Sequence, residues 1–172
     1  STNQHSLSGY SDVSINNGSY PLSTGSFEGG VMNVSPNIAA YVSGPLGINL
    51  ADIDVNNLSI SSRTTGSFSM SPGSGSFTAT VENTILSGQL IIDPLAGGTI
   101  NQDLAGTMTS SQVTGNIYKT SSGMHFSIPL NINISGSDPG SGVSGSVSIN
   151  GTITGDFVAT NPNIYCIAAP NS

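Results

Sequence analysis

The chain has 172 residues, enough for one domain with its own core, yet only 6% of them are charged and the formal net charge is −7. An ordinary soluble domain has about 25% charged residues. The chain has one Lys and one Arg, too few for the basic surface that nucleic acids and anionic membranes require. No apolar run approaches the roughly 18 residues that span a bilayer. We therefore expect no nucleic-acid partner and no membrane insertion.

Alternating apolar and polar residues predict β-strands along most of the chain, because successive side chains of a strand point to opposite faces. A helix is suggested only by a short pattern over 45–53. In chain order, the predicted strands are 11–16, 37–42, 55–62, 76–82, 89–93, 115–119, 124–134, 143–155 and 156–160.

The two longest patterns predict which side chains are buried. Over 143–155, Val147, Ile149 and Ile153 share the face expected to point into the core, and the opposite face holds only Ser, Asn and Thr. Pro129 lies on the polar face of 124–134 and has no N–H, so we expect this strand at a sheet edge or with a bulge. The other side chains predicted to point inward are Val13, Ile15, Leu58, Ile60, Phe77, Ala79, Val81, Met124, Phe126, Ile128, Leu130, Ile132 and Ile134.

Turn-forming residues such as Gly44-Pro45 and Gly97-Gly98 separate the predicted strands at short intervals. This spacing is typical of an all-β sandwich or barrel. We predict an all-β, single-domain antiparallel β-sandwich, Ig-like or jelly-roll-like, over residues 20–172. The sandwich is open to completion by a strand from a neighbouring subunit.

Few residues are suited to catalysis. His5 and His125 are the only histidines, Glu28 and Glu82 are the only glutamates, and no spacing pairs a general acid with a base. We therefore predict that the protein is not an enzyme and needs no cofactor. A hydrolase is the enzymatic alternative, and this inventory argues against it.

The segment that begins with Asp52, Asp54 and Asn56 starts like a calcium-binding loop. Its sixth position is not Gly and its twelfth is Arg63 instead of Glu, so it is not an EF-hand. Calcium held by Asp52 and Asp54 stays an alternative that would favour a binding module.

Cys166 and Lys119 are the only residues of their kind. A single cysteine excludes a disulfide within the chain, and the apolar neighbours of Cys166 predict that it is buried. Lys119 is a candidate for an isopeptide crosslink to an Asn, the alternative being a solvated lysine.

Five N-x-S/T sequences are candidate glycosylation sites in a secreted protein. Strand parity directs three of their asparagines, Asn57, Asn133 and Asn150, away from the core. The complete set of predicted sites is Asn17, Asn33, Asn57, Asn133 and Asn150.

The polar strand faces lack the charges that keep ordinary monomers apart, so we interpret them first as surfaces for assembly or for bearing sugars. Tolerance of acid is a compatible interpretation, since few groups titrate. The third interpretation is that regularly spaced hydroxyl groups on these faces bind carbohydrate or ice.

Open sheet edges are the usual route to assembly in β-proteins, because an extended segment of a neighbour completes their hydrogen bonds. We predict that residues 1–19 form an N-terminal extension and candidate donor strand, with Val13 and Ile15 filling an apolar groove of the next subunit. The C-terminal segment 156–170 is the rival donor, and either end is equally an ordinary terminal strand of its own domain.

One β-domain rich in Ser, Thr and Asn, with N-x-S/T sequences and without the hydrophobic N-terminal helix of type IV pilins, resembles secreted filament subunits built by donor-strand exchange. The thread and bundling-pilus subunits of archaeal surfaces are similar in character. The resemblance implies head-to-tail homopolymers, heavy glycosylation, roles in adhesion or biofilm, and no catalysis.

We therefore predict a structural subunit of an extracellular surface filament, whose partner is a second copy of the chain. The polar start STNQHSLSG, without Met, fits a secreted chain whose signal peptide was removed. The alternative is a cell-surface adhesin or carbohydrate-binding β-sandwich that contacts glycans or cell surfaces. A viral capsid or fibre subunit also fits the composition.

Overall fold

The computed structural model describes residues 4–16, 23–71, 74–137, 144–157 and 164–168, and all structural statements concern these residues. The strands are β1 (Ser6–Asn16), β2 (Thr24–Ser35), β3 (Ile38–Ser43), β4 (Asn49–Thr64), β5 (Phe68–Ser69), β6 (Ser76–Pro94), β7 (Ile100–Asp103), β8 (Met108–Lys119), β9 (Met124–Ser137), β10 (Ser144–Phe157) and β11 (Ile164–Ala168). The 3-10 turn η1 (Pro45–Gly47) is the one helical element among them. The suggestion of a helix over 45–53 is therefore wrong, because Asn49 already begins β4.

All strands belong to one antiparallel sheet, in the order β3-β4-β2-β1-β11-β10-β9-β8-β6-β7, with the short β5 beside β2. The sheet is strongly curled, and β4 pairs with both β2 and β6. These pairings close a ring of eight strands, namely β1, β2, β4, β6, β8, β9, β10 and β11. The all-β antiparallel prediction is confirmed, whereas a β-sandwich is not, because a single curled sheet surrounds the core.

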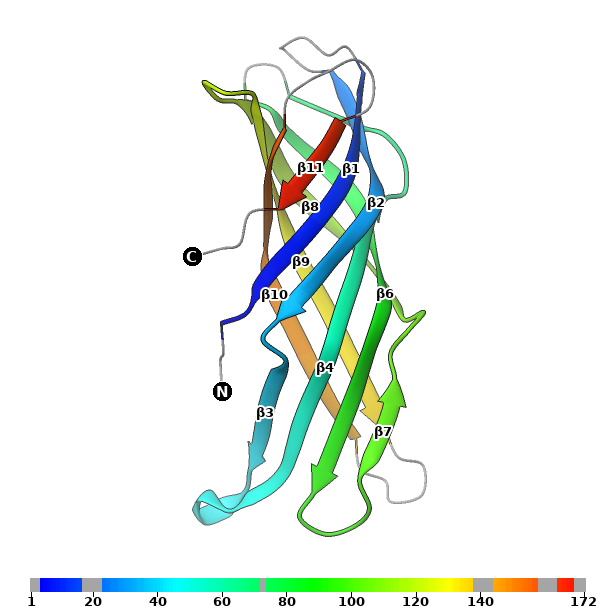
Figure 1. Cartoon of the computed structure of the whole chain (residues 1–172), viewed down its shortest axis with the longest axis vertical. Coiled ribbons are helices and arrows are strands. Elements are labelled where there is room, and N and C mark those ends of the chain that lie inside the picture. The colour runs from blue at the N-terminus through cyan, green and yellow to red at the C-terminus, as the bar shows by residue number, and fades with distance from the viewer. Residues whose placement is uncertain (1–3, 17–22, 72–73, 138–143, 158–163, 169–172) are drawn as a thin grey trace.

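The ring is closed in the upper half of Figure 1 and divided in the lower half. The β8–β9 ladder stops at the pair Asn116 and Ser127, just before Pro129, which has no N–H to donate to β8. Below this point β3, β4, β6 and β7 form one layer and β9 and β10 another (Figure 1). We call residues 38–55, 89–103, 130–137 and 144–151 the lower half, and the remaining described residues the upper half.

Apolar side chains fill the interior, and polar ones cover the outside. The upper half contains four stacked or tilted phenylalanine rings, with Phe68 and Phe77 centroids 4.0 Å apart and Phe27 and Phe126 centroids 5.5 Å apart. The lower core is aliphatic. Its fully buried members include Val55, Leu90, Ile92, Ile132 and Ile134.

Most of the inward-facing residues predicted from the sequence are confirmed. Ile153 is buried, while Val147 and Ile149 pack against the core and are half-buried. The side chains predicted inward over 124–134, 76–82 and 55–62 are all buried. Pro129 is exposed on β9, whose side away from β10 has no paired strand past Ser127 among the described residues.

Val13 and Ile15, the predicted donor side chains, are buried in the core of their own chain. Their strand β1 pairs with β2 on one side and with β11 on the other. In the single chain, the part of segment 1–19 that is described from Ser6 onward is thus an integral strand and not a separate extension. Exchange of this strand between copies remains a prediction.

Candidate functional site

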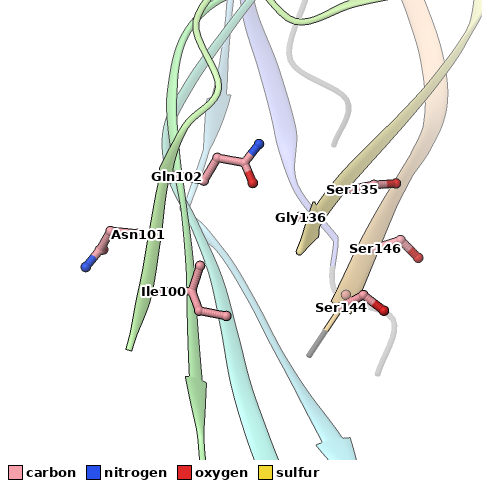
Figure 2. A pocket seen from close by; sticks show the side chains of 8 residues that line it. Ile100, Asn101, Gln102, Ser135, Gly136, Ser144 and Ser146 are labelled. Carbon is pink, nitrogen blue, oxygen red and sulfur yellow. The ribbon is translucent and has the colours of Figure 1, made fainter. Parts of the chain in front are cut away.

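A groove of about 620 Å³ opens in the lower half, where β7 faces β9 and β10 without pairing to them (Figure 2). No charged residue lines it. The lining residues are Ile100, Asn101, Gln102, Ser135, Gly136, Ser144, Gly145 and Ser146.

The two walls of the groove differ in chemistry. Ile100 and Gln102 extend from β7 toward the opposite wall, while Asn101 points away (Figure 2). The opposite wall presents Gly136 and Gly145, which are directly paired across β9 and β10. A Cβ on Gly136 would lie 2.6 Å from Leu90 Cδ2 and 2.9 Å from Gln102 Oε1, so a larger residue there would have to displace the ends of these two side chains. This wall is therefore bare backbone.

Two unpaired strand edges border the groove. Among the described residues, β7 pairs only with β6, and β9 past Ser127 pairs only with β10. The outer edges of both strands therefore present backbone N–H and C=O groups without a ladder partner, which is the chemistry that binds an extended segment. The groove is suited to a strand or a narrow polar chain.

Four of the five predicted glycosylation asparagines are exposed in the described part of the chain, and Asn17 lies outside it. Asn133 Oδ1 accepts a hydrogen bond of 2.6 Å from Ser148 Oγ on the neighbouring strand. Asn57 adopts a left-handed backbone with φ 53°, and its N–H donates to Asn37 Oδ1. Asn33 and Asn150 face outward on β2 and β10. Their accessibility fits glycosylation, which remains a prediction.

The outward face of β9 and β10 is a ladder of uncharged polar pairs. Directly opposite one another are Asn131 and Asn150, Asn133 and Ser148, and Ser135 and Ser146. We call these three pairs the outer ladder. Its regular hydroxyl and amide groups match what the sequence predicted for this face.

The two calcium-ligand candidates lie on one strand, with Asp52 exposed and Asp54 half-buried. Asp52 accepts from Asn49 Nδ2 at 2.8 Å and lies opposite Asp93 on β6. Within the described ranges, no three His, Cys, Asp or Glu residues are grouped so as to hold a metal ion. The structure therefore adds no third ligand to the pair.

The two histidines are apart. His125 Nδ1 lies 2.8 Å from Asp156 Oδ1 across β9 and β10, and His5 Nδ1 lies 3.0 Å from the carbonyl oxygen of Pro36. Lys119 is exposed at the end of β8. Cys166 lies on β11 with its backbone opposite Ser11. Lys119 and His125 belong to adjacent pairs of the β8–β9 ladder, whereas His5 lies beside Pro36.

The sequence-based analysis missed a row of polar side chains inside the ring. Ser62 Oγ donates to Asn83 Oδ1 at 2.6 Å, and Asn83 is paired in register with Thr109. Thr109 Oγ1 and Ser111 Oγ are buried without a hydrogen-bond partner among the described residues. The sequence did indicate this burial, because Asn83 lies between Val81 and Ile85 at the spacing of two that places all three side chains on the inward face.

Comparisons with known proteins add little. No protein-family model matches the chain, and no curated protein matches it. Among solved structures, the chain is similar to the crystal structure of Ail, the attachment invasion locus protein of Yersinia pestis, in complex with the heparin analogue sucrose octasulfate. The match has 9% identity, covers 96% of this chain and 94% of that chain, and has a TM-score of 0.22, too low to support an argument. Separately, no helix in the described ranges is long and apolar enough to cross a membrane.

Proposed function

We propose that the chain is a structural subunit of an extracellular surface filament, a pilus or thread, with roles in adhesion or biofilm. Copies assemble head to tail when a strand of one copy adds to the open edges of the next. The observation that carries this proposal is the groove between the unpaired edges of β7 and β9. The nearly uncharged surface is consistent with it, because little repulsion opposes close packing of copies.

Strand addition is favourable here for two reasons. Each backbone hydrogen bond formed at the edges contributes about 1 kcal/mol net. Covering the half-buried Ile100, which lines the groove, adds apolar burial at about 25 cal/mol per Å². A strand added between β7 and β9 would also connect the two facing layers of the lower half through their unpaired edges.

Of the two candidate donors, we favour the C-terminal one. β1 pairs with β2 at eleven positions and contributes Val13 to the core, so its release would dismantle the fold. β11 pairs with β1 at five positions and with β10 at two. Release of β11 therefore breaks fewer strand pairings than release of β1 would.

A matched pair of variants tests the groove. In Gln102→Arg, the new charge reaches water in the monomer through the open groove. An added strand would bury this charge, with a free-energy cost of about 3 kcal/mol. We expect a roughly 100-fold higher critical concentration for assembly, measured by sedimentation and electron microscopy. Asn101→Arg carries the same charge on the side of β7 that points away (Figure 2) and should assemble normally. Equal assembly of both variants would reject the groove, and absence of filaments from native material would reject the function.

A carbohydrate-binding adhesin is the second candidate, favoured by the outer ladder on β9 and β10. Hydroxyl and amide groups at regular spacing match the hydrogen-bonding groups of a sugar chain. Titration of the purified protein with neutral oligosaccharides tests this candidate. Saturable binding that Asn131→Ala weakens would support it, and no binding at millimolar sugar would reject it. Mass spectrometry of the mature chain tests the predicted glycans.

A further inference from the structure

Exposed aliphatic side chains gather at the lower end of the molecule, where β3 ends and β4 begins and on the turn between β6 and β7 (Figure 1). We call this cluster the tip. Its members are Val42, Leu46, Ile48, Leu50 and Leu95. Most of the remaining outer surface is polar, so this concentration at one end is a distinct surface feature.

The tip is an ordered structure. Leu95 N donates to Leu50 O at 2.8 Å and ties the two turns together, and Gly44 N donates to Ile48 O at 2.8 Å. A Cβ on Gly44 would lie 2.8 Å from Leu50 Cγ, so the Leu50 side chain lies against the turn backbone. The backbone of both turns and the Leu50 side chain are therefore held in place in the absence of a partner.

Leu46 is unfavourable in the monomer on two grounds. Its φ of 64° lies in the left-handed region, which Gly and Asn adopt far more readily than Leu. Its side chain is also 98% exposed. A strained backbone and a fully hydrated apolar side chain at one position indicate a residue that is buried in a complex.

Carboxylates adjoin the tip. Asp52 and Asp93 lie opposite each other on β4 and β6, two residues after Leu50 and two residues before Leu95. Asp54 follows on the outer face of β4. The described residues of the lower half include no Lys, Arg or His. Two tips would repel each other, as would a tip and an anionic membrane. The partner surface must therefore combine apolar contact area with positive charge.

The upper end of the same molecule has this combination. At the β8–β9 turn, Lys119 is exposed beside Tyr118, which is 46% exposed and whose ring centroid lies 5.1 Å from that of His125 (Figure 1). The carboxylate beside this ring pair, Asp156, lies 2.8 Å from His125 Nδ1 and so has a partner within its own chain. We infer that the tip of one copy docks on this upper end of the next, with Leu46 against Tyr118 and the aspartates near Lys119. Because the two surfaces differ and lie at opposite ends of the elongated molecule (Figure 1), the contact is heterologous and repeats head to tail into a linear polymer. This inference rests on the proposed self-assembly.

The test uses the full chain with four sets of variants. Leu46→Asn keeps a residue that accepts the left-handed backbone but removes the apolar contact, so folding should be retained and the critical concentration should rise at least tenfold. Lys119→Glu should weaken assembly to a similar degree. Adding Asp52→Lys and Asp93→Lys to Lys119→Glu should restore it, because the summed charge of positions 52, 54 and 93 is then positive and faces the new carboxylate. Gln112→Arg on β8, an exposed position that belongs to neither end and does not line the groove, serves as the control for an added surface charge.

The outcomes separate this inference from the proposed function. A wild-type chain that stays monomeric under all conditions overturns both. Normal polymers of Leu46→Asn, or no rescue by the charge reversal, overturn the tip contact and leave strand addition standing. Cosedimentation of the wild type with phosphatidylcholine vesicles, lost in Leu46→Asn while polymers are unchanged, would assign the tip to lipid and also overturn the inference.

Discussion

The upper and lower halves of the molecule have the same kind of alternating sequence, but they differ in whether the ring of strands is closed and the core is covered. In the upper half the ring is closed and Phe27, Phe68, Phe77 and Phe126 fill its centre. In the lower half two layers face each other, and their apolar residues are only partly covered. Most of the half-buried apolar residues that pack against the core lie there, namely Ala40, Ala51, Ile100, Val147 and Ile149. The comparison teaches that strand pairing, not composition, decides which half is complete.

Identifiable residues cause the difference. Pro129 lies just past the point where the β8–β9 ladder stops, so this ladder does not continue into the lower half. Strand β2 ends at Ser35, just before Pro36, so it does not extend into the lower half either. The paired glycines Gly136 and Gly145 then leave the wall of the lower half without side chains that would fill the groove. The division is therefore encoded by residues that remove a donor or a side chain.

Phe77→Ala should have the largest effect on stability, because it removes a buried ring from the closed half. We expect a loss of about 3–5 kcal/mol and a decrease in Tm of about 10 °C, measured by chemical and thermal denaturation. A loss below about 1 kcal/mol would mean that the aromatic cluster does not stabilise the upper half as described.

Ile153→Ala and Ile149→Ala compare the two halves on one strand. Both side chains point inward from β10, but Ile153 is buried in the closed half and Ile149 is half-buried in the divided half. We expect Ile153→Ala to cost about 3 kcal/mol and Ile149→Ala about half as much, by urea denaturation. Equal losses would indicate that the lower half is as well packed as the upper.

Asn83→Leu tests the polar row within the ring. The change leaves the Ser62 hydroxyl buried without its acceptor and should cost about 1–3 kcal/mol. The double variant Asn83→Leu with Ser62→Ala removes both partners and should recover most of that loss. If the double variant is no more stable than Asn83→Leu, the hydrogen bond between these side chains is not what stabilises the row.

Arg63→Met should have the smallest effect. Arg63 Nη2 lies 2.8 Å from Glu82 Oε2, but the Arg63 side chain is 58% exposed, and solvent and salt screen such a pair. We expect a loss below about 1 kcal/mol that disappears in high salt. A larger, salt-independent loss would show that this ion pair helps to hold the β4–β6 pairing.

The sequence predicted the local features of the fold well, because they follow from a period of two. The inward faces of 124–134 and 143–155 are examples. β2 was missed, since Gly29 and Gly30 interrupt its alternation, and β7 has only four residues. Within the strand predicted over 76–82, the pattern was not followed as far as Asn83, so the polar row went unnoticed.

Closure of the ring and the groove were not predictable in the same way. They depend on β4 pairing with both β2 and β6 and on which edges stay unpaired, and no local pattern encodes such contacts. The predicted glycosylation asparagines were easier to place, since parity alone puts Asn133 and Asn150 outside. The tip was missed because apolar turn residues such as Leu46 have no periodicity.

β4 and β6 run through both halves as one antiparallel pair, from Ala51 opposite Pro94 to Thr64 opposite Val81, with register shifts on either side of Ser59. If the β4–β6 pairing separates in one half, the other half loses two of its strands as well. We therefore expect a single calorimetric transition in which the van't Hoff and calorimetric enthalpies agree, despite the unequal closure of the two halves. The long hairpin makes the chain one cooperative unit.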